Sequence, residues 1–215
     1  MKEFEKFIKK LAREINQELP GFSAQRLMAP LGRKKVTDYI NKKNLPKKSA
    51  ILILIYPEEN TYSPKTVLIL RPDESRTHSN QISFPGGGFD EKDEELSMTA
   101  LRETEEEIGV GRKSISLIGE LTSIYIPVSN YIVYPFIGIC NTKPIFSINA
   151  TEVKDLIEIE IKELLNVKNK TTTLRHIKIR NENMEVPCYA VDGKIIWGAT
   201  AMIISELVEI IRKIE

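Results

Sequence analysis

The chain has 215 residues, and its 31 Lys and Arg against 30 Asp and Glu leave a formal net charge of +1. This length fits one large domain, or one domain with an appendage, and buries enough surface to fold without a metal or a disulfide. Hydrophobic residues make up 41% and charged residues 28%, which excludes disorder over most of the chain. The near-neutral charge argues against a nucleic-acid polymer as partner.

The cysteine content and the apolar runs indicate a soluble cytoplasmic protein. Cys140 and Cys188 are too few and too widely spaced for a disulfide framework, so we interpret them as buried free thiols. The first ten residues lack the apolar core of a signal peptide. The longest apolar run, residues 50–56, is far shorter than the ~20 residues that cross a bilayer, so no membrane partner is expected.

Hydrophobic periodicity predicts the first half of the chain to alternate helices with short strands. An amphipathic helix over residues 3–18 precedes a mixed basic region, 23–48. Apolar residues 50–56 and 65–70 predict two strands paired as a hairpin, and a short strand over 81–84 stops at a proline and three glycines. A helix follows over residues 94–108, with Asp93 as its expected N-cap and Gly109 as its C-cap.

In the second half of the chain, the sequence pattern predicts further strands and a C-terminal helix. We expect strands at 114–121 and 132–140, a short helix near the end of 149–165, strands at 175–179, 186–191 and 194–196, and a helix at 198–214. This order predicts an α+β sandwich. We expect residues 1–48 to form an N-terminal helical extension packed on a domain that spans 49–215.

The most informative segment is the acidic helix that follows the glycines. At ~100° per residue, Glu103, Glu106 and Glu107 share one sector of the helix, beside an apolar stripe that faces the core. Like charges at this spacing repel, and Mg²⁺ or Mn²⁺ would relieve the repulsion because hard cations prefer oxygen ligands. A solvated acidic face is the ordinary alternative. The preceding glycines, which allow close approach of the backbone, and Arg102, which can hold a carboxylate, favour a functional site.

This segment resembles the signature of the Nudix hydrolases, G-x5-E-x7-R-E-U-x-E-E-x-G-U, where U is aliphatic. The matching residues are Gly88, Glu94, Arg102, Glu103, Glu106, Glu107, Gly109 and Val110. Thr104 departs from the pattern, since an aliphatic residue is usual there. The resemblance implies an α/β/α sandwich with a mixed β-sheet and the hydrolysis of a nucleoside diphosphate linked to another group.

The same resemblance implies roles for individual residues. Glu106 and Glu107 are implied metal ligands, and Glu103 a further ligand or the group that activates water. The Gly88 carbonyl is implied to complete the metal shell, while Arg102 and Glu94 orient the carboxylates. Glu152 is either one more carboxylate for the metal from outside the motif or an ordinary capping charge.

A second segment just upstream resembles the sequence motif of the coenzyme A pyrophosphatase subgroup of these hydrolases, LLTxRSxxxRxxxGxxxFPGG. The matching residues are Leu68, Arg71, Arg76, Phe84, Pro85, Gly86 and Gly87, whereas Ile69, Pro72 and Asn80 depart from it. Enzymes of this subgroup cleave coenzyme A to 4′-phosphopantetheine and adenosine 3′,5′-bisphosphate.

This second resemblance suggests how the substrate is bound. Arg71 and Arg76 suit phosphate oxygens, because guanidinium groups hold them bidentately. His78 is a further candidate donor, and Phe84, Gly86 and Gly87 belong to the same expected substrate site. The basic cluster at 33–35 and 42–43 is interpreted as solvated surface, with contact to the 3′-phosphate as the alternative. Trp197 is interpreted as a core anchor.

Other functions remain open at this point. The enzyme alternative is a pyrophosphatase for ADP-ribose or NADH, and the non-enzyme alternative is a Nudix module that senses a nucleotide without catalysis. Such modules commonly lose motif glutamates, whereas all three are present here. The resemblance is also compatible with a homodimer.

Overall fold

The computed structural model describes residues 1–39, 45–72, 80–177 and 181–215 of the chain. Its helices are α1 (Lys2–Ile15), α2 (Gly21–Gln25), α3 (Leu96–Ile108), α4 (Ile161–Leu165) and α5 (Gly198–Ile211). The strands, in chain order, are β1 (Lys47–Pro57), β2 (Pro64–Leu70), β3 (Ile82–Ser83), β4 (Gly86–Gly88), β5 (Ser116–Glu120), β6 (Ile124–Ile126), β7 (Tyr131–Ile139), β8 (Asp155–Glu160), β9 (Lys170–Ile177), β10 (Glu182–Val191) and β11 (Lys194–Trp197).

Eight of the described strands form one mixed sheet. Its central path runs β3-β2-β1-β7-β5, while β4 pairs with β1, β6 with β7 and β8 with β2. The parallel pair is β1 with β7, joined over nine consecutive positions, and the other pairs in this sheet are antiparallel. A second, antiparallel sheet has the order β11-β10-β9. The mixed sheet therefore presents two faces, each of which needs a covering layer.

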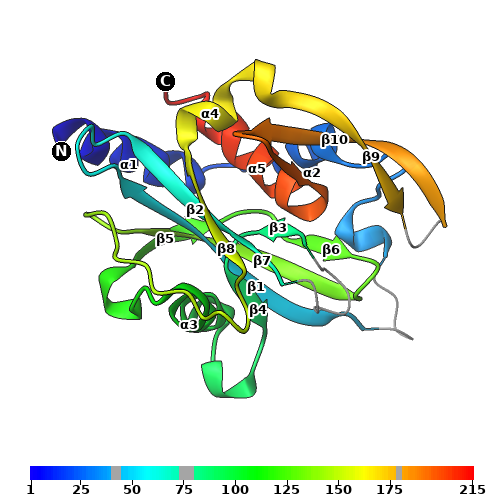
Figure 1. Ribbon diagram of the computed structural model, residues 1–215, viewed down its shortest axis with the longest axis horizontal. Coiled ribbons are helices and arrows are strands. Elements are labelled where there is room, and N and C mark those ends of the chain that lie inside the picture. Colours follow the sequence, from blue (N-terminus) through cyan, green and yellow to red (C-terminus); the bar gives the residue numbers. More distant parts are fainter. Residues whose placement is uncertain (40–44, 73–79, 178–180) are drawn as a thin grey trace.

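Alternate residues of β1 point into two separate cores, because successive side chains of a strand face opposite sides of a sheet. Ile53 and Ile55 join the core that contains α1 and α5, whereas Leu52 and Leu54 join the core beneath α3. Figure 1 shows the result, with α3 under one face of the sheet and α1, α2 and α5 over the other. This is the predicted α/β/α sandwich with a mixed sheet.

The N-terminal segment is tied to α5 by a buried carboxylate. Glu206 accepts hydrogen bonds from Gln25 Nε2 at 2.8 Å, from the Gly21 amide at 3.1 Å and from Thr122 Oγ1 at 2.7 Å. The side chain of Glu206 is fully buried. α1, α2 and the turn that follows α2 thus pack against the last helix, while the division of the chain at residue 48 stays a prediction.

Most predicted elements are confirmed, and their differences have local causes. α1 ends at Ile15, its last buried residue, and the Asn16 amide side chain bonds back to Ala12 O at 2.7 Å. β1 extends beyond the predicted strand because β7 pairs with it along almost its whole length. The 50–56 and 65–70 hairpin is confirmed by the antiparallel pairing of β1 with β2.

One element is not predicted and one predicted cap is wrong. The short helix expected near the end of 149–165 is confirmed as α4, but β8 precedes it, because the alternating sequence DLIEIE pairs along β2 and buries Ile157 and Ile159. Asp93 is not the N-cap of α3: it ends a 3₁₀ turn, Glu91–Asp93, and the helix begins two residues later than predicted. Gly109 does end this helix in the left-handed conformation, with a φ of 74°.

Candidate active site

The glycine turn brings the backbone against the acidic helix. A Cβ at Gly86 would lie 2.3 Å from Ala50 O of β1, and a Cβ at Gly87 would lie 2.3 Å from the carboxylate carbon of Glu103. A side chain at Gly86 would therefore clash with the backbone of β1, whereas one at Gly87 would displace the carboxylate of Glu103. At Gly88 an added Cβ would make an ordinary contact with Tyr131, 3.8 Å away. The close approach to the helix thus depends on the first two glycines.

Three carboxylates converge beside this turn. Glu103 and Glu107 lie one helical turn apart on α3, and Glu152 comes from the loop before β8. One oxygen from each lies within 4.8 Å of the other two, a spacing that suits a shared cation. Glu152 is exposed, and its convergence with the helix agrees with the metal-ligand alternative for this residue.

Burial and mutual repulsion make this cluster electrostatically costly without a cation. Burial raises the pKa of Glu107 to about 7, even though Arg71 and the Gly86 amide favour its charged form. Burial also raises the pKa of Glu103, with Arg102 acting in the opposite direction. Hard oxygen donors with raised pKa values around one point fit a divalent cation such as Mg²⁺ or Mn²⁺.

Arg102 organises the carboxylates from one side. Its Nη1 donates to Glu103 at 2.7 Å and to Glu106 at 2.9 Å, so both carboxylates are held by the same nitrogen. Its Nε and Nη2 form a two-pronged contact with Asp93, at 2.8 and 3.0 Å. Glu106, a predicted ligand, lies outside the three-carboxylate cluster and next to Glu103 through this shared donor.

Among the described residues, the acid outside α3 that contacts Arg102 is Asp93, and not the neighbouring motif residue Glu94. Asp93 is buried, also accepts from Thr99 Oγ1 at 2.8 Å, and has its pKa lowered to about 2 by the hydrogen bond from Arg102. Glu94 is exposed, with a φ of 60°. Glu94 thus lies in a turn between the 3₁₀ turn and α3. Asp93, one residue earlier, makes the contact with Arg102. Sequence reasoning missed this role because it placed Asp93 at a helix cap.

Arg71 closes the opposite side of the cluster. It donates from Nη2 to Gly86 O at 3.0 Å and from Nε to Ser83 Oγ at 3.2 Å, and its Nη2 lies 3.7 Å from Glu107. The Gly86 amide donates to Glu107 at 2.8 Å. The predicted phosphate-binding arginine thus lies between the glycine turn and the carboxylates. Arg76 and His78, its predicted companions, lie outside the described residues.

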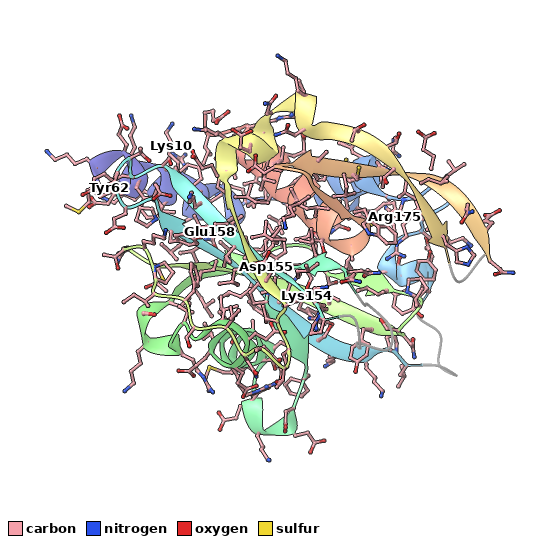
Figure 2. The ribbon with its side chains drawn as sticks, viewed as in Figure 1. Lys10, Tyr62, Lys154, Asp155, Glu158 and Arg175 are labelled. Atoms are coloured by element: carbon pink, nitrogen blue, oxygen red, sulfur yellow. The ribbon has the colours of Figure 1, made fainter. Side chains whose placement is uncertain are left out.

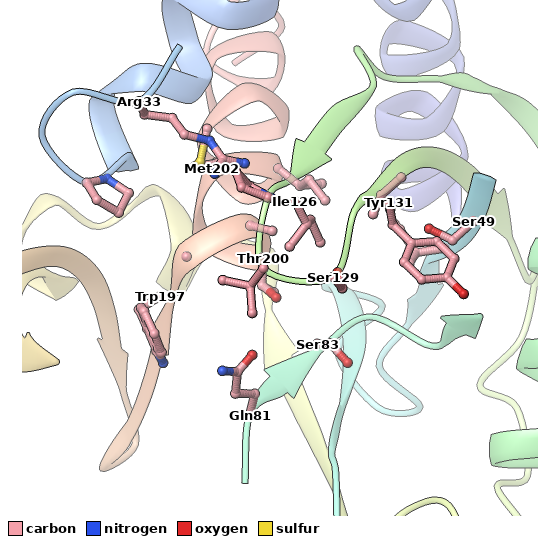
Figure 3. Close-up of a pocket in the computed structure, with 18 of the residues that line it drawn as sticks. Arg33, Ser49, Gln81, Ser83, Ile126, Ser129, Tyr131, Trp197, Thr200 and Met202 are labelled. Carbon is pink, nitrogen blue, oxygen red and sulfur yellow. The ribbon is translucent and has the colours of Figure 1, made fainter. Parts of the chain in front are cut away.

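A cavity of about 750 Å³ opens from the glycine turn toward the second sheet. Arg71, Gly86, Gly87 and Gly88 lie at one end, and mostly apolar side chains line the remainder, with the hydroxyl groups of Ser49, Ser83 and Ser129 among them. Figure 3 shows Trp197, Gln81 and Thr200 on one side of this cavity and Ser129 and Tyr131 on the other. Phe84, a predicted substrate residue, is almost fully buried in the core next to the cavity.

Two cavity residues differ from their sequence interpretation. Trp197 is half-buried and lines the cavity, and the guanidinium of Arg175 lies over its ring at 5.6 Å; Figure 2 shows Arg175 on the β9–β10 hairpin. Arg33, interpreted first as solvated surface and alternatively as a contact to the substrate, also lines the cavity. The sequence carries no local signal for either placement, because their partners come from distant segments.

Comparison with known proteins identifies the family. The model of the NUDIX domain matches residues 46–179. The chain belongs to the Nudix family. Proteins named Nudix hydrolase NudL from Yersinia pestis (strain Pestoides F) and Yersinia pseudotuberculosis serotype O:1b (strain IP 31758) are each 33% identical over 165 residues, covering 76% of this chain and 79% of theirs. The chain is therefore a Nudix-type diphosphate hydrolase.

Solved structures of the family share the fold. The Nudix hydrolase RenU from M. Smegmatis aligns with a TM-score of 0.52 at 14% identity, covering 79% of this chain and 88% of that one. The MutT protein from Methanosarcina mazei Go1 gives the same TM-score and identity, covering 81% and 99%. At this identity the likeness concerns the fold alone. No helix in the described ranges has the length and hydropathy to cross a membrane.

Proposed function

We propose that this Nudix hydrolase cleaves the diphosphate of coenzyme A or its derivatives, yielding 4′-phosphopantetheine and adenosine 3′,5′-bisphosphate. The observation that carries the proposal is the continuous cavity that begins at Arg71 and the glycine turn and extends into apolar space. Its volume lies within the range of about 300–1,000 Å³ that is usual for small-molecule sites. A long substrate with a central diphosphate and a largely apolar arm suits this shape.

Nudix hydrolases generally need a divalent cation, and we propose Mg²⁺ or Mn²⁺ here. Glu103, Glu107 and Glu152 would hold it, together with Glu106 once this side chain leaves Arg102, and the carbonyl of Gly88 or a neighbouring glycine. When bound, the ion neutralises the diphosphate and makes a water molecule more acidic. The chain supplies the remaining functions through its own side chains.

Each remaining function has a residue in suitable surroundings. Arg71 is the proposed ligand of a diphosphate oxygen, and its position on the cavity wall beside the glycine turn supports this role. Glu103, whose raised pKa brings it nearer to neutrality, is the proposed acceptor of the proton from the attacking water. Arg102 and Asp93 fix the orientation of Glu103. One P–O bond of the diphosphate breaks, and water supplies the oxygen and the proton that complete the two phosphate products.

Product analysis on a small panel tests the substrate. The purified protein is incubated with coenzyme A, ADP-ribose or NADH, with Mg²⁺, with Mn²⁺ or with a chelator, and products are separated by chromatography. We expect metal-dependent cleavage of coenzyme A with the highest kcat/KM of the three. Cleavage of ADP-ribose or NADH alone would assign the enzyme to the alternative substrate class. A homodimer is a separate prediction, which analytical ultracentrifugation tests.

A further inference from the structure

Arg33 reaches into the cavity from the N-terminal segment. Figure 3 shows its side chain extending toward Ile126 and Met202. Its Nη2 donates to the backbone oxygen of Tyr125, and its guanidinium carbon lies 5.9 Å from the centre of the Tyr39 ring. Tyr39 in turn stacks at a tilt on Tyr125, with ring centroids 4.8 Å apart. The guanidinium is therefore held in a defined place rather than spread over the surface.

The charge of Arg33 lacks an acidic partner in the described part of the chain. It makes no ion pair with a carboxylate there, and burial lowers its pKa from the ordinary value. Arg71 differs, since Glu107 lies 3.7 Å from it. A cation partly removed from water without a counter-charge is costly, and an anionic group of a ligand would offset that cost.

We propose that Arg33 is a specificity-determining residue that binds a second phosphate of the substrate, a phosphomonoester away from the diphosphate that is cleaved. The proposal rests on the proposed function, and in coenzyme A this group is the 3′-phosphate of the ribose. Within the described ranges only Nη2 is engaged, by the Tyr125 carbonyl, so Nε and Nη1 are the donors proposed to bind phosphate oxygens, which suit a planar guanidinium. Arg71 and Arg33 line the same cavity, so one ligand can contact both.

The placement of Arg33 gives the N-terminal segment a role in recognition. The Glu206 contacts with Gly21 and Gln25 hold the start of this segment against α5, whose first residues also line the cavity. Pro30 and Tyr39 line it as well, on either side of Arg33. Residues before the matched NUDIX domain thus complete the wall of the substrate cavity.

The test compares substrates that differ by one phosphate. For wild type, kcat/KM is measured for coenzyme A and for dephospho-coenzyme A, and the ratio is measured again in Arg33→Gln, Arg33→Lys and Lys34→Gln. Lys34 is the matched control because it is the exposed neighbour on the same segment. We expect a wild-type ratio of about 10–100, the usual effect of hydrogen bonds to a charged group. The ratio should approach one in Arg33→Gln, be partly retained in Arg33→Lys, and stay at the wild-type value in Lys34→Gln.

The outcomes separate this proposal from the proposed function. Suppose that coenzyme A is cleaved. If the wild-type ratio is then near one, or if Arg33→Gln lowers kcat/KM equally for both substrates, the role of Arg33 is overturned and the proposed function stands. If coenzyme A is not cleaved, NADPH and NADH provide the second pair that differs by one phosphate. If wild type prefers NADPH to NADH and Arg33→Gln abolishes this preference, Arg33 binds the additional phosphate and the coenzyme A proposal is rejected. Failure to discriminate in both pairs overturns Arg33 as the phosphate-binding residue.

Discussion

The two ends of the substrate cavity are built in different ways. At the end beside the glycine turn, where we propose that the diphosphate is cleaved, α3 supplies Glu103, Glu106 and Glu107 next to the turn, and its own Arg102 binds Glu103 and Glu106. At the other end, where we propose that the substrate is recognised, the lining comes from the N-terminal segment, the stretch from β6 to β7, the strands β9, β10 and β11, and the start of α5. The catalytic end is thus local in sequence, and the recognition end is assembled by tertiary packing. Substitutions at the two ends should consequently affect different measurements.

The largest expected effect is on turnover, at the catalytic end. Glu107→Gln and Glu106→Gln should each lower kcat on the order of 10²–10⁴-fold while leaving the fold intact, because each removes a negative charge from the metal site. Glu105→Gln is the control, since Glu105 lies on the same helix but is exposed and pairs with Arg112. Steady-state kinetics and circular dichroism check this. Wild-type turnover in either site variant would refute the role of that glutamate.

A substitution behind the recognition end should instead lower the free energy of unfolding. Glu206→Ala removes the acceptor of Gln25, Gly21 and Thr122 in a fully buried place, so the free energy of unfolding should fall by about 2–4 kcal/mol. Urea denaturation measures this value. Glu209→Gln provides the comparison on the same helix, because Glu209 pairs with Arg212 near the surface. Equal stability of the two variants would show that the buried contacts do not hold the N-terminal segment.

The contrast between the ends also explains what sequence can predict. The motif helix is predicted within two residues because its spacing, its glycines and its C-cap are all local signals. Arg33 is not predictable in this way, since its acceptor, the Tyr125 carbonyl, is 92 residues away and nothing near Arg33 distinguishes it from the adjacent lysines. β8 is not predicted because its alternation of polar and apolar residues spans only six positions, and the strand is stabilised by its pairing with β2. Glu152 joins the cluster only through that same tertiary pairing.

The metal-free protein should show how much the burial of the Glu107 carboxylate costs the folded state. Because the folded pKa of Glu107 is raised from 4.5 to about 7, its contribution favours the folded state below pH 4.5 and is lost as the pH rises through 7. The loss should be at most about 3 kcal/mol, given 1.36 kcal/mol per pKa unit. Unfolding free energies are measured from pH 5 to 8 with a chelator. Glu107→Gln should flatten this dependence relative to Glu105→Gln, and Mg²⁺ should stabilise wild type more at pH 8 than at pH 6.

The smallest expected effect is a difference in kcat between substitutions of two neighbouring acidic residues, Asp93 and Glu94. Asp93→Asn should lower kcat about 10–100-fold, because outer-shell partners of metal ligands commonly have effects of this size and Asp93 holds Arg102 through two hydrogen bonds. Glu94→Gln should change kcat little, since Glu94 is exposed at a left-handed turn. The motif spacing assigns the opposite importance to these residues. Kinetics of the two variants, with metal titrations to detect weaker binding, therefore decide whether contacts or spacing define the supporting acid; a larger loss in Glu94→Gln would favour the spacing.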